Sequence, residues 1–444
     1  MKYELSVSGK HHKQIYDQLF GNNDSGNYVL ALCGSYSNGK MLRLLIREIM
    51  ICKDSGESLP EQNSRITAVH EKAVRQANNV VRITADGRID NGAGADGITI
   101  LQAVLRMRAD GTLHGSVLHN GEKVTITTVK LVGNDLCFWP AADSVDMTIL
   151  PEFAVRHIQL FGQGTYKKLR NISVAVIGAS GTGSPTIEQL ARLGIGRLVL
   201  VDPDHIEEKN INRIINSSIK DVKRRVAKVD MLAKAVRNMG LGVKVEVYHK
   251  DISHPNVVRA IAGCDVVFGC MDSVDGRHLL NRIATFYLLP YFDIGIKLIA
   301  DGNGGIEQVC GTIHYLQPGG SSLLSRRVYT MEQLIAANLK RTDIDEYNER
   351  IKSKYIDGID EDRPAVISVN MLFSAFAVNE FLARIHPFKE DPNEEYSTIR
   401  FSLTQGQFYK ENESEPCQVM LKHVGRGDVS PLLDMPQLSE EVVK

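Results

Sequence analysis

The sequence has few cysteines, and none of them are paired at metal-binding spacing. Seven cysteines are scattered through 444 residues, and no two of them form a C-x-x-C pair. An odd number of dispersed cysteines argues against a disulfide framework. This cysteine usage is typical of a reducing compartment, so we expect a cytoplasmic protein.

The chain also lacks long apolar runs and an excess of charge of one sign. It contains no stretch of about 18 uncharged apolar residues, so no membrane span is expected. The first residues, MKYELSVSGKHHKQ, lack the apolar core of a signal peptide. The formal net charge is −1, whereas nucleic-acid binders usually carry a basic excess. We therefore expect a soluble protein that binds neither membrane nor nucleic acid.

The first part of the chain, to residue 140, predicts a smaller α/β domain. It mixes short strand-like runs with two helix-like stretches. The strand-like runs are Tyr28–Cys33, Leu42–Cys52 and Val80–Thr84, and the helix-like stretches are Ile66–Asn79 and Ile98–Met107. The stretch Trp139–Glu152 has no clear periodicity and reads as a linker, so we place a linker at residues 141–155.

From residue 156 to 444 the pattern changes to apolar strands that alternate with helices. The strand-like segments are Ile172–Gly178, Arg197–Asp202, Val243–His249 and Val266–Gly269, and a helix is expected over Val226–Met239. Apolar strands between helices indicate a parallel sheet that is covered on both faces. The sequence therefore predicts a doubly wound, Rossmann-like α/β domain.

A glycine-rich turn joins the first of these strands to the following helix. Gly178, Gly181 and Gly183 lie where bare backbone can approach a phosphate and where a helix N-terminus offers free N–H groups. A tight turn alone would also explain such glycines. Asp202, however, ends the next strand, where a carboxylate can bind ribose hydroxyls. Turn and aspartate together predict a nucleotide site.

Basic and amide side chains after the second strand favour ATP over a nicotinamide cofactor. Asn210, Arg213 and Lys228 follow this strand, in the segments EKNINRIINSS and RRVAKVDMLAKAV. Each alone could be a solvated surface residue. ATP carries about four negative charges, which cations and Mg²⁺ must neutralise, whereas a nicotinamide site needs few cations. An NAD-dependent oxidoreductase remains the alternative within this fold.

Asp272 ends the segment DVVFGCMD at the carboxyl end of a predicted strand. Open α/β sheets bind their ligands at this edge. A carboxylate there suits Mg²⁺, which is commonly held by one or two carboxylates together with phosphates and water. The alternative is a helix N-cap.

The stretch from Arg156 to Ile385 resembles the ThiF/MoeB/HesA group and the ubiquitin-activating enzymes. The segments that carry the resemblance are VIGASGTGSPTIEQLARLGIGRLVLVDPD, KNINR, AKVDMLA, CMDSVDGRHLLN and DRPAVISVNMLFSAFAVNEFL. The resemblance implies an adenylyltransferase that uses ATP and Mg²⁺ to activate the C-terminal carboxylate of a ubiquitin-like or sulfur-carrier protein.

The same resemblance implies a role for each candidate residue. The glycine turn and Asp202 are expected to hold the α-phosphate region and the ribose. Asn210, Arg213 and Lys228 are expected to contact the phosphates, and Asp272 to hold Mg²⁺. Arg156 occupies the place of an arginine that reaches the γ-phosphate bound to a neighbouring subunit, which implies a homodimer.

The chain departs from the family pattern at two places. Ser180 stands where the glycine turn usually has a further glycine, which is tolerable if Ser180 keeps a negative φ. Relatives also commonly bind a structural zinc through two C-x-x-C pairs. The corresponding positions here are Ser322, Ser325, Cys417 and Met420. One thiolate in four positions cannot hold zinc in the usual way, so we expect no structural zinc.

No cysteine lies between Cys310 and Cys417. This interval includes the loop 321–363, where thioester-forming relatives place their catalytic cysteine, so a thioester at the usual position is excluded. The protein could stop at the acyl-adenylate, pass the acyl group to a partner such as a conjugating-enzyme-like protein, or form an oxyester on Ser322 or Ser325. The oxyester ranks last, because a serine is a poor nucleophile without an adjacent base.

The alternative from a different class is an eroded scaffold, a pseudoenzyme in a bacterial ubiquitin-like conjugation pathway. The retained set of Asp202, Arg213, Lys228 and Asp272 argues against it, since a scaffold has no use for these residues.

Residues 1–140 resemble JAB/MPN-type isopeptidases, in the order VLALCGS, AVHEKAVRQANN, VVRIT and GADGITILQAVL. The H-x-H-P motif of active members is missing, and of their second zinc-binding motif only Asp96 is retained. His70, His114 and His119 do not form a ligand set. The resemblance therefore implies an inactive domain that serves docking or dimerisation.

Overall fold

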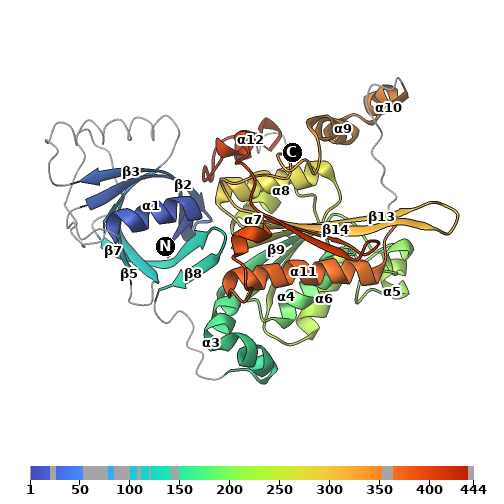
Figure 1. Ribbon diagram of the computed structural model, residues 1–444, viewed down its shortest axis with the longest axis horizontal. Coiled ribbons are helices and arrows are strands. Elements are labelled where there is room, and N and C mark those ends of the chain that lie inside the picture. The colour runs from blue at the N-terminus through green and yellow to red at the C-terminus, as the bar shows by residue number, and fades with distance from the viewer. Residues whose placement is uncertain are drawn as a thin grey trace. The chain divides into compact units, whose positions relative to one another are not determined.

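The computed structural model describes residues 2–20, 27–53, 79–84, 101–107, 112–119, 122–141, 150–352 and 364–438. The chain forms two compact units (Figure 1). The first comprises residues 1–146, 285–288 and 423–444, and the second comprises residues 147–284 and 289–422. The helix predicted over Ile66–Asn79 lies outside the described residues, except for Asn79. His70 and Asp96 also lie outside the described residues.

The first unit is built on an eight-stranded sheet. Its strands are β1 (Lys2–Ser8), β2 (Asn27–Ser37), β3 (Met41–Lys53), β4 (Asn79–Thr84), β5 (Leu101–Met107), β6 (Leu113–His119), β7 (Glu122–Val132) and β8 (Leu136–Pro140). They follow the order β1-β3-β2-β4-β5-β6-β7-β8, and β1 also pairs with β7, so the sheet closes on itself. The helix α1 (Gly9–Leu19) begins after Ser8, whose hydroxyl caps it by accepting the N–H of His11.

One predicted element of this unit is wrong. The segment Ile98–Met107 was expected to be helical, but Leu101–Met107 forms the strand β5 between β4 and β6. Ala103 and Leu105 both enter the hydrophobic core, which is the two-residue period of a strand. A short apolar run does not by itself distinguish a buried helix from a buried strand. The strands predicted over Tyr28–Cys33, Leu42–Cys52 and Val80–Thr84 are confirmed as parts of β2, β3 and β4.

The second unit contains another eight-stranded sheet. Its strands are β9 (Ser173–Ile177), β10 (Arg197–Val201), β11 (Lys244–Tyr248), β12 (Val266–Gly269), β13 (Tyr291–Ala300), β14 (Ile306–Leu316), β15 (Thr398–Ser402) and β16 (Gln407–Glu411). The order is β11-β10-β9-β12-β13-β14-β15-β16. The first five strands of this order are parallel and the last three are antiparallel additions. The predicted doubly wound α/β fold is confirmed.

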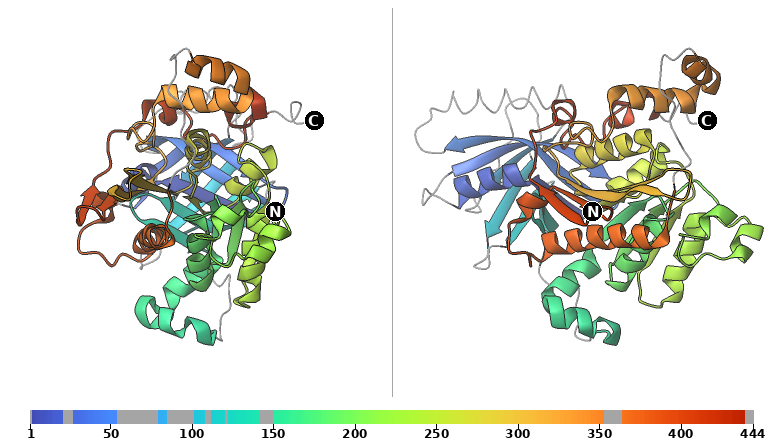
Figure 2. Two further views of the ribbon diagram at one scale, coloured as in Figure 1. Left: turned by 90° about the vertical axis from the view of Figure 1, so that its right-hand side faces the viewer. Right: turned by 45° about the vertical axis from the view of Figure 1, so that its right-hand side comes forward.

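The α-helices of this unit are α3 (Val155–Asn171), α4 (Gly183–Arg192), α5 (Ile219–Lys223), α6 (Lys228–Asn238), α7 (Pro255–Ala262), α8 (Val274–Tyr287), α9 (Met331–Thr342), α10 (Ile344–Lys352), α11 (Ile367–Ile385) and α12 (Gln418–Leu421). Both faces of the sheet are covered: Figures 1 and 2 show α4, α6 and α11 on one side of it and α8 on the other. The strand order reverses at β9, between β10 and β12, which is where open α/β sheets form a ligand crevice.

The expected loop 321–363 is partly helical. Its described part, to residue 352, contains α9 and α10. The start of α9 is fixed by a capping box, in which Thr330 Oγ1 accepts the Gln333 N–H at 3.2 Å and Gln333 Oε1 accepts the Thr330 N–H at 3.0 Å.

No helix in the described ranges is long and apolar enough to cross a membrane. The division at residues 140 and 155 stays a prediction.

A buried polar cluster lies between α8 and the strands β13 and β14. Asp293 is fully buried and accepts hydrogen bonds from Arg277 Nε at 2.9 Å and from the Tyr291 hydroxyl at 2.7 Å. His314 stands opposite Asp293 in the β13–β14 register. Burial lowers the pKa of His314 to about 3, and the guanidinium groups of Arg326 and Arg277 act in the same direction. His314 is therefore neutral in the folded protein.

We expect the His314 ring to weaken the fold in mild acid. Its pKa is about 3 when folded and near the ordinary value of about 6.5 when unfolded, so the unfolded state binds the proton between these limits. Stability is then lost as the pH falls below about 6.5. By this linkage the ring accounts for about 2 kcal/mol of the unfolding free energy lost between pH 7.5 and pH 5. Urea unfolding at the two pH values should show a smaller loss for His314→Gln than for wild type; equal losses would contradict this.

Candidate nucleotide site

The glycine turn between β9 and α4 is packed too closely to accept other residues. Gly178 has φ of 93°, and a Cβ there would lie 2.6 Å from the carbonyl oxygen of Cys270. A Cβ on Gly183 would lie 1.8 Å from the carbonyl oxygen of Gly178. Ser180 keeps a negative φ, as its replacement of a glycine requires. The turn therefore presents bare backbone and the N-terminus of α4 at the switch point of the sheet.

Asp202 follows β10 and braces this turn. Its Oδ2 accepts the Ala179 N–H at 2.7 Å, and its Oδ1 accepts the Asp204 N–H at 2.9 Å. The side chain is only 5% exposed, and burial raises the pKa of its carboxyl, against the opposing effect of Lys228. A carboxylate oxygen can accept more than one hydrogen bond. Asp202 can thus hold the turn and still accept a bond from a ribose hydroxyl.

The predicted phosphate contacts come from two segments beside Asp202. Lys228, the first residue of α6, is buried, with its Nζ 2.7 Å from Asp204 Oδ2 and 3.7 Å from Asp202 Oδ1. Asn210 is buried too, and its Oδ1 accepts the Glu207 N–H at 3.2 Å. The ammonium group is therefore held at the Asp202 end of the site, while the Asn210 oxygen caps the short helix Glu208–Asn210.

Arg213 reaches the glycine turn with its aliphatic stem. A Cβ on Gly181 would lie 3.2 Å from Arg213 Cδ. The guanidinium donates from Nη1 to Lys209 O at 2.7 Å and to Asn212 Oδ1 at 3.0 Å. This half-buried cation can exchange contacts with its own segment for a phosphate group at modest cost.

Asp272 is exposed and lies two residues beyond the point where β12 meets the glycine turn. The Cys270 N–H bonds Ile177 O at 2.8 Å, directly before Gly178. The helix α8 begins at Val274, so the residue in the capping position is Ser273. Asp272 is therefore left with its carboxylate at the carboxyl edge of the sheet. A carboxylate there fits a Mg²⁺ ion that is shared with phosphates.

Arg156 lies apart from this group. It is exposed on α3, and its Nη1 donates to Gln159 Oε1 on the same helix at 3.1 Å. A role in the site of a second subunit stays a prediction, because a single chain does not test it.

The structure adds Asn370 and Ser374 of α11 to the residues predicted from sequence. A Cβ on Gly181 would lie 2.7 Å from Asn370 Nδ2, and Ser374 Oγ donates to Thr182 O at 2.8 Å. The available signal was a polar residue inside the apolar run SVNMLFSAF. Sequence alone does not show which neighbour such a residue faces.

The ThiF family model matches residues 154–415, which is more than half of the chain. The chain belongs to the ThiF family. The match covers most of the second unit, including every candidate residue named for the nucleotide site. It begins at residue 154, so the JAB/MPN likeness of the first part stays a prediction.

Curated relatives are similar to about a third of this chain. The SAMP-activating enzyme E1 of Haloferax volcanii is 36% identical over 149 residues, 33% of this chain and 54% of that enzyme. The ubiquitin-like modifier-activating enzyme 5 of Drosophila persimilis is 28% identical over 169 residues, 35% of this chain and 41% of that enzyme. The matches thus span about half, or less, of the relatives' own length.

Two further proteins show similarity to this chain. The adenylyltransferase and sulfurtransferase MOCS3 of Danio rerio is 35% identical over 133 residues, 30% of this chain and 27% of that protein. The crystal structure of E. coli MccB with ATP is 18% identical, with a TM-score of 0.46, and covers 61% of this chain and 74% of that chain.

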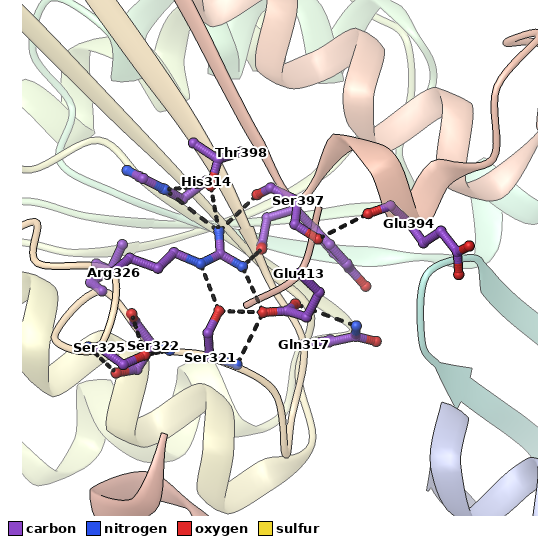
Figure 3. Close-up of polar contacts among 12 residues, drawn as sticks. His314, Gln317, Ser321, Ser322, Ser325, Arg326, Glu394, Ser397, Thr398 and Glu413 are labelled. Atoms are coloured by element: carbon purple, nitrogen blue, oxygen red, sulfur yellow. Dashed lines mark hydrogen bonds and ion pairs between the residues drawn. The ribbon is translucent and has the colours of Figure 1, made fainter. Parts of the chain in front are cut away.

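In this ThiF-family chain, Arg326 joins the two segments that the resemblance assigns to zinc ligands (Figure 3). Its Nε donates to Ser321 Oγ at 2.7 Å, and its Nη2 donates to Tyr315 O at 2.9 Å and to Glu413 Oε1 at 3.1 Å. Its Nη1 donates to Ser397 O at 2.7 Å. A nearly buried ion pair therefore links the loop after β14 to the segment that leads to Cys417.

Ser322 and Ser325 form two reciprocal hydrogen bonds, each between the hydroxyl group of one residue and the backbone N–H of the other. Ser325 Oγ accepts the Ser322 N–H at 2.9 Å, and Ser322 Oγ accepts the Ser325 N–H at 3.1 Å. Ser322 is fully buried, whereas Ser325 is exposed. Neither hydroxyl bonds a basic group in the described part of the chain. This arrangement closes a turn and does not activate a nucleophile.

Replacing Arg326 should destabilise the second unit strongly. Arg326→Met removes the ion pair with Glu413 and the hydrogen bonds to Tyr315 O and Ser397 O, while Glu413 keeps the Ser321 N–H and Ser397 O keeps the Tyr315 N–H. Breaking a buried ion pair by removing one partner costs about 3–5 kcal/mol. The measurement is the free energy of unfolding in urea. Arg327→Met is the matched control, because Arg327 is the next residue and is exposed. Equal losses for both variants would contradict the role of Arg326.

Proposed function

We propose that this protein uses ATP and Mg²⁺ to adenylate the C-terminal carboxylate of a ubiquitin-like or sulfur-carrier protein. One observation carries the proposal: the glycine turn, Asp202, Lys228 and the stem of Arg213 lie together at the switch point of a parallel sheet, and Asp272 follows two residues after Cys270, which bonds the strand before the turn. Membership of the ThiF family supports the reaction class, and the relatives that are named activating enzymes and adenylyltransferases support a carrier protein as substrate.

The residues of the site have distinct proposed roles in binding ATP. The turn backbone and the N-terminus of α4 hold the α-phosphate region, and Asp202 binds the ribose. Arg213 and Lys228 neutralise phosphate charge, with Asn210 holding the segment between them. A carboxylate oxygen of the carrier then bonds to the α-phosphorus, and the bond to the pyrophosphate oxygen breaks. Pyrophosphate leaves with the electron pair, so positioning and charge neutralisation suffice without a protein nucleophile.

Mg²⁺ would be held by Asp272 and would neutralise charge on the departing pyrophosphate. The exposed carboxylate at the sheet edge fits this ion, which prefers few protein ligands. We further propose that Arg156 serves the ATP site of a second subunit, so that the active form is a homodimer. The first unit would then contribute docking or dimerisation.

The proposed end point is the acyl-adenylate or direct transfer to a partner's nucleophile. Cys264, Cys270 and Cys417 are buried, and burial raises the pKa of the Cys270 thiol to about 12. A buried, protonated thiol is a poor nucleophile, so Cys270 is poorly suited to carry the acyl group. Cys264 and Cys417 are poorly suited because their side chains are buried away from a carrier protein.

Asp272 provides the test of the adenylation site. Exchange of labelled pyrophosphate into ATP, with the cognate carrier and Mg²⁺ present, is expected for wild type. We expect Asp272→Asn to reduce the exchange rate by about 100-fold or more, the usual effect of removing one electrostatic element of a reaction site. Asp230→Asn is the control, because Asp230 is an exposed carboxylate on α6. Equal exchange rates for wild type and Asp272→Asn would contradict the proposal. So would the absence of exchange in wild type, which would favour the scaffold hypothesis.

The proposed end point predicts that no thioester forms. After incubation with carrier and ATP·Mg, denaturing electrophoresis without reductant should show no adduct that dithiothreitol removes. Cys310→Ser and Cys417→Ser should keep the exchange rate of wild type, because neither thiol takes part. A dithiothreitol-sensitive adduct would overturn this end point. An adduct that resists dithiothreitol and is cleaved by mild base would instead indicate an oxyester.

A further inference from the structure

Asn370 is a buried amide in an apolar helix. It lies in the first turn of α11 and is only 7% exposed, between buried neighbours such as Val369 and Phe373. Its Oδ1 is enclosed and has no hydrogen-bond partner among the described residues. A buried acceptor without a donor destabilises a fold, and asparagine is a weak helix former. The position therefore keeps an asparagine at a cost in stability, for which the packing of α11 offers no explanation.

The other end of this carboxamide faces the glycine turn. A Cβ placed on Gly181 would lie 2.7 Å from Asn370 Nδ2 and 3.0 Å from its Cγ. Arg213 Cδ would lie 3.2 Å from the same point. Asn370 and the stem of Arg213 thus enclose Gly181 from two directions. Nδ2 is a donor with two hydrogens, and it lies where we propose that phosphate groups bind.

The position of Asn370 is fixed by contacts on both sides of it. One turn further along α11, Ser374 Oγ lies 2.8 Å from Thr182 O and 2.7 Å from Asn370 O. Just before the helix, Ala365 O accepts a hydrogen bond from Asn212 Nδ2 at 3.3 Å, and Asn212 Oδ1 accepts one from Arg213. The start of α11 is therefore tied to the glycine turn and to the segment of Arg213. A side chain held in this way is positioned before a ligand arrives.

We propose that Asn370 is a further phosphate-binding residue of the nucleotide site, whose Nδ2 donates a hydrogen bond to a phosphate oxygen of ATP beside Gly181. The inference rests on the proposed function and extends it to α11. Phosphate oxygens accept hydrogen bonds and do not donate them, so the amino end of the carboxamide is the end that recognises them.

The test uses a substitution that should keep or raise the stability of the fold while it weakens the binding of ATP. Asn370→Leu keeps the approximate size of the side chain and removes both the unpaired Oδ1 and the donor. We expect an unfolding temperature equal to or above that of wild type and a Kd for ATP·Mg raised about tenfold, as for the loss of one hydrogen bond to a charged group. Asn370→Asp removes the donor and adds a negative charge, so it should raise the Kd further.

Calorimetric titration of the full-length protein with ATP·Mg, together with thermal unfolding, decides the outcome. Asn379→Leu is the control, because Asn379 is exposed on the same helix. Unchanged ATP affinity in Asn370→Leu would overturn the inference. So would a loss of affinity with a matching fall in unfolding temperature, since this is the result of a purely structural role. If wild type itself binds no ATP, the proposed function fails, which distinguishes the two failures.

Discussion

The hydrogen bond between the Asp202 carboxylate and the Ala179 N–H is the contact on which the candidate site depends. It fixes the glycine turn of one strand to the end of the neighbouring strand, at 2.7 Å and out of solvent. The second oxygen of Asp202 orders Asp204, which in turn binds the ammonium of Lys228. One buried carboxylate therefore sets the geometry of the turn and of a cation that lies 26 positions further along the chain. Burial of the Asp202 carboxyl, which this bridging position requires, raises its pKa.

A second constraint comes from the far end of the sequence. The helix α11 packs against the turn, and Ser374 lies at hydrogen-bond distance from Thr182 O. Gly181 is glycine because Asn370 and Arg213 fill the space that a side chain would need. The nucleotide site is thus enclosed by elements nearly 190 residues apart, and the stability of α11 bears on the shape of the site.

An ion pair joins the two segments for which the resemblance predicts no zinc. Arg326 and Glu413 join the two segments in which relatives commonly place zinc ligands, and Ser322 and Ser325 close the turn beside them. A charged hydrogen-bond network of this kind is directional and is satisfied within the protein. This network can hold the two segments together at positions where three of the four expected thiols are replaced by Ser322, Ser325 and Met420.

The sequence by itself determined the doubly wound fold, the glycine turn and the positions of Asp202, Lys228, Arg213 and Asp272, because these depend on local periodicity and short spacings. It did not determine β5, where a short apolar run fits a helix or a strand, nor the helices α9 and α10 in an expected loop. Only the tertiary structure placed Asn370 beside Gly181 and Arg326 beside Glu413. Such pairings join distant residues, and their geometry is set by the packing of whole elements.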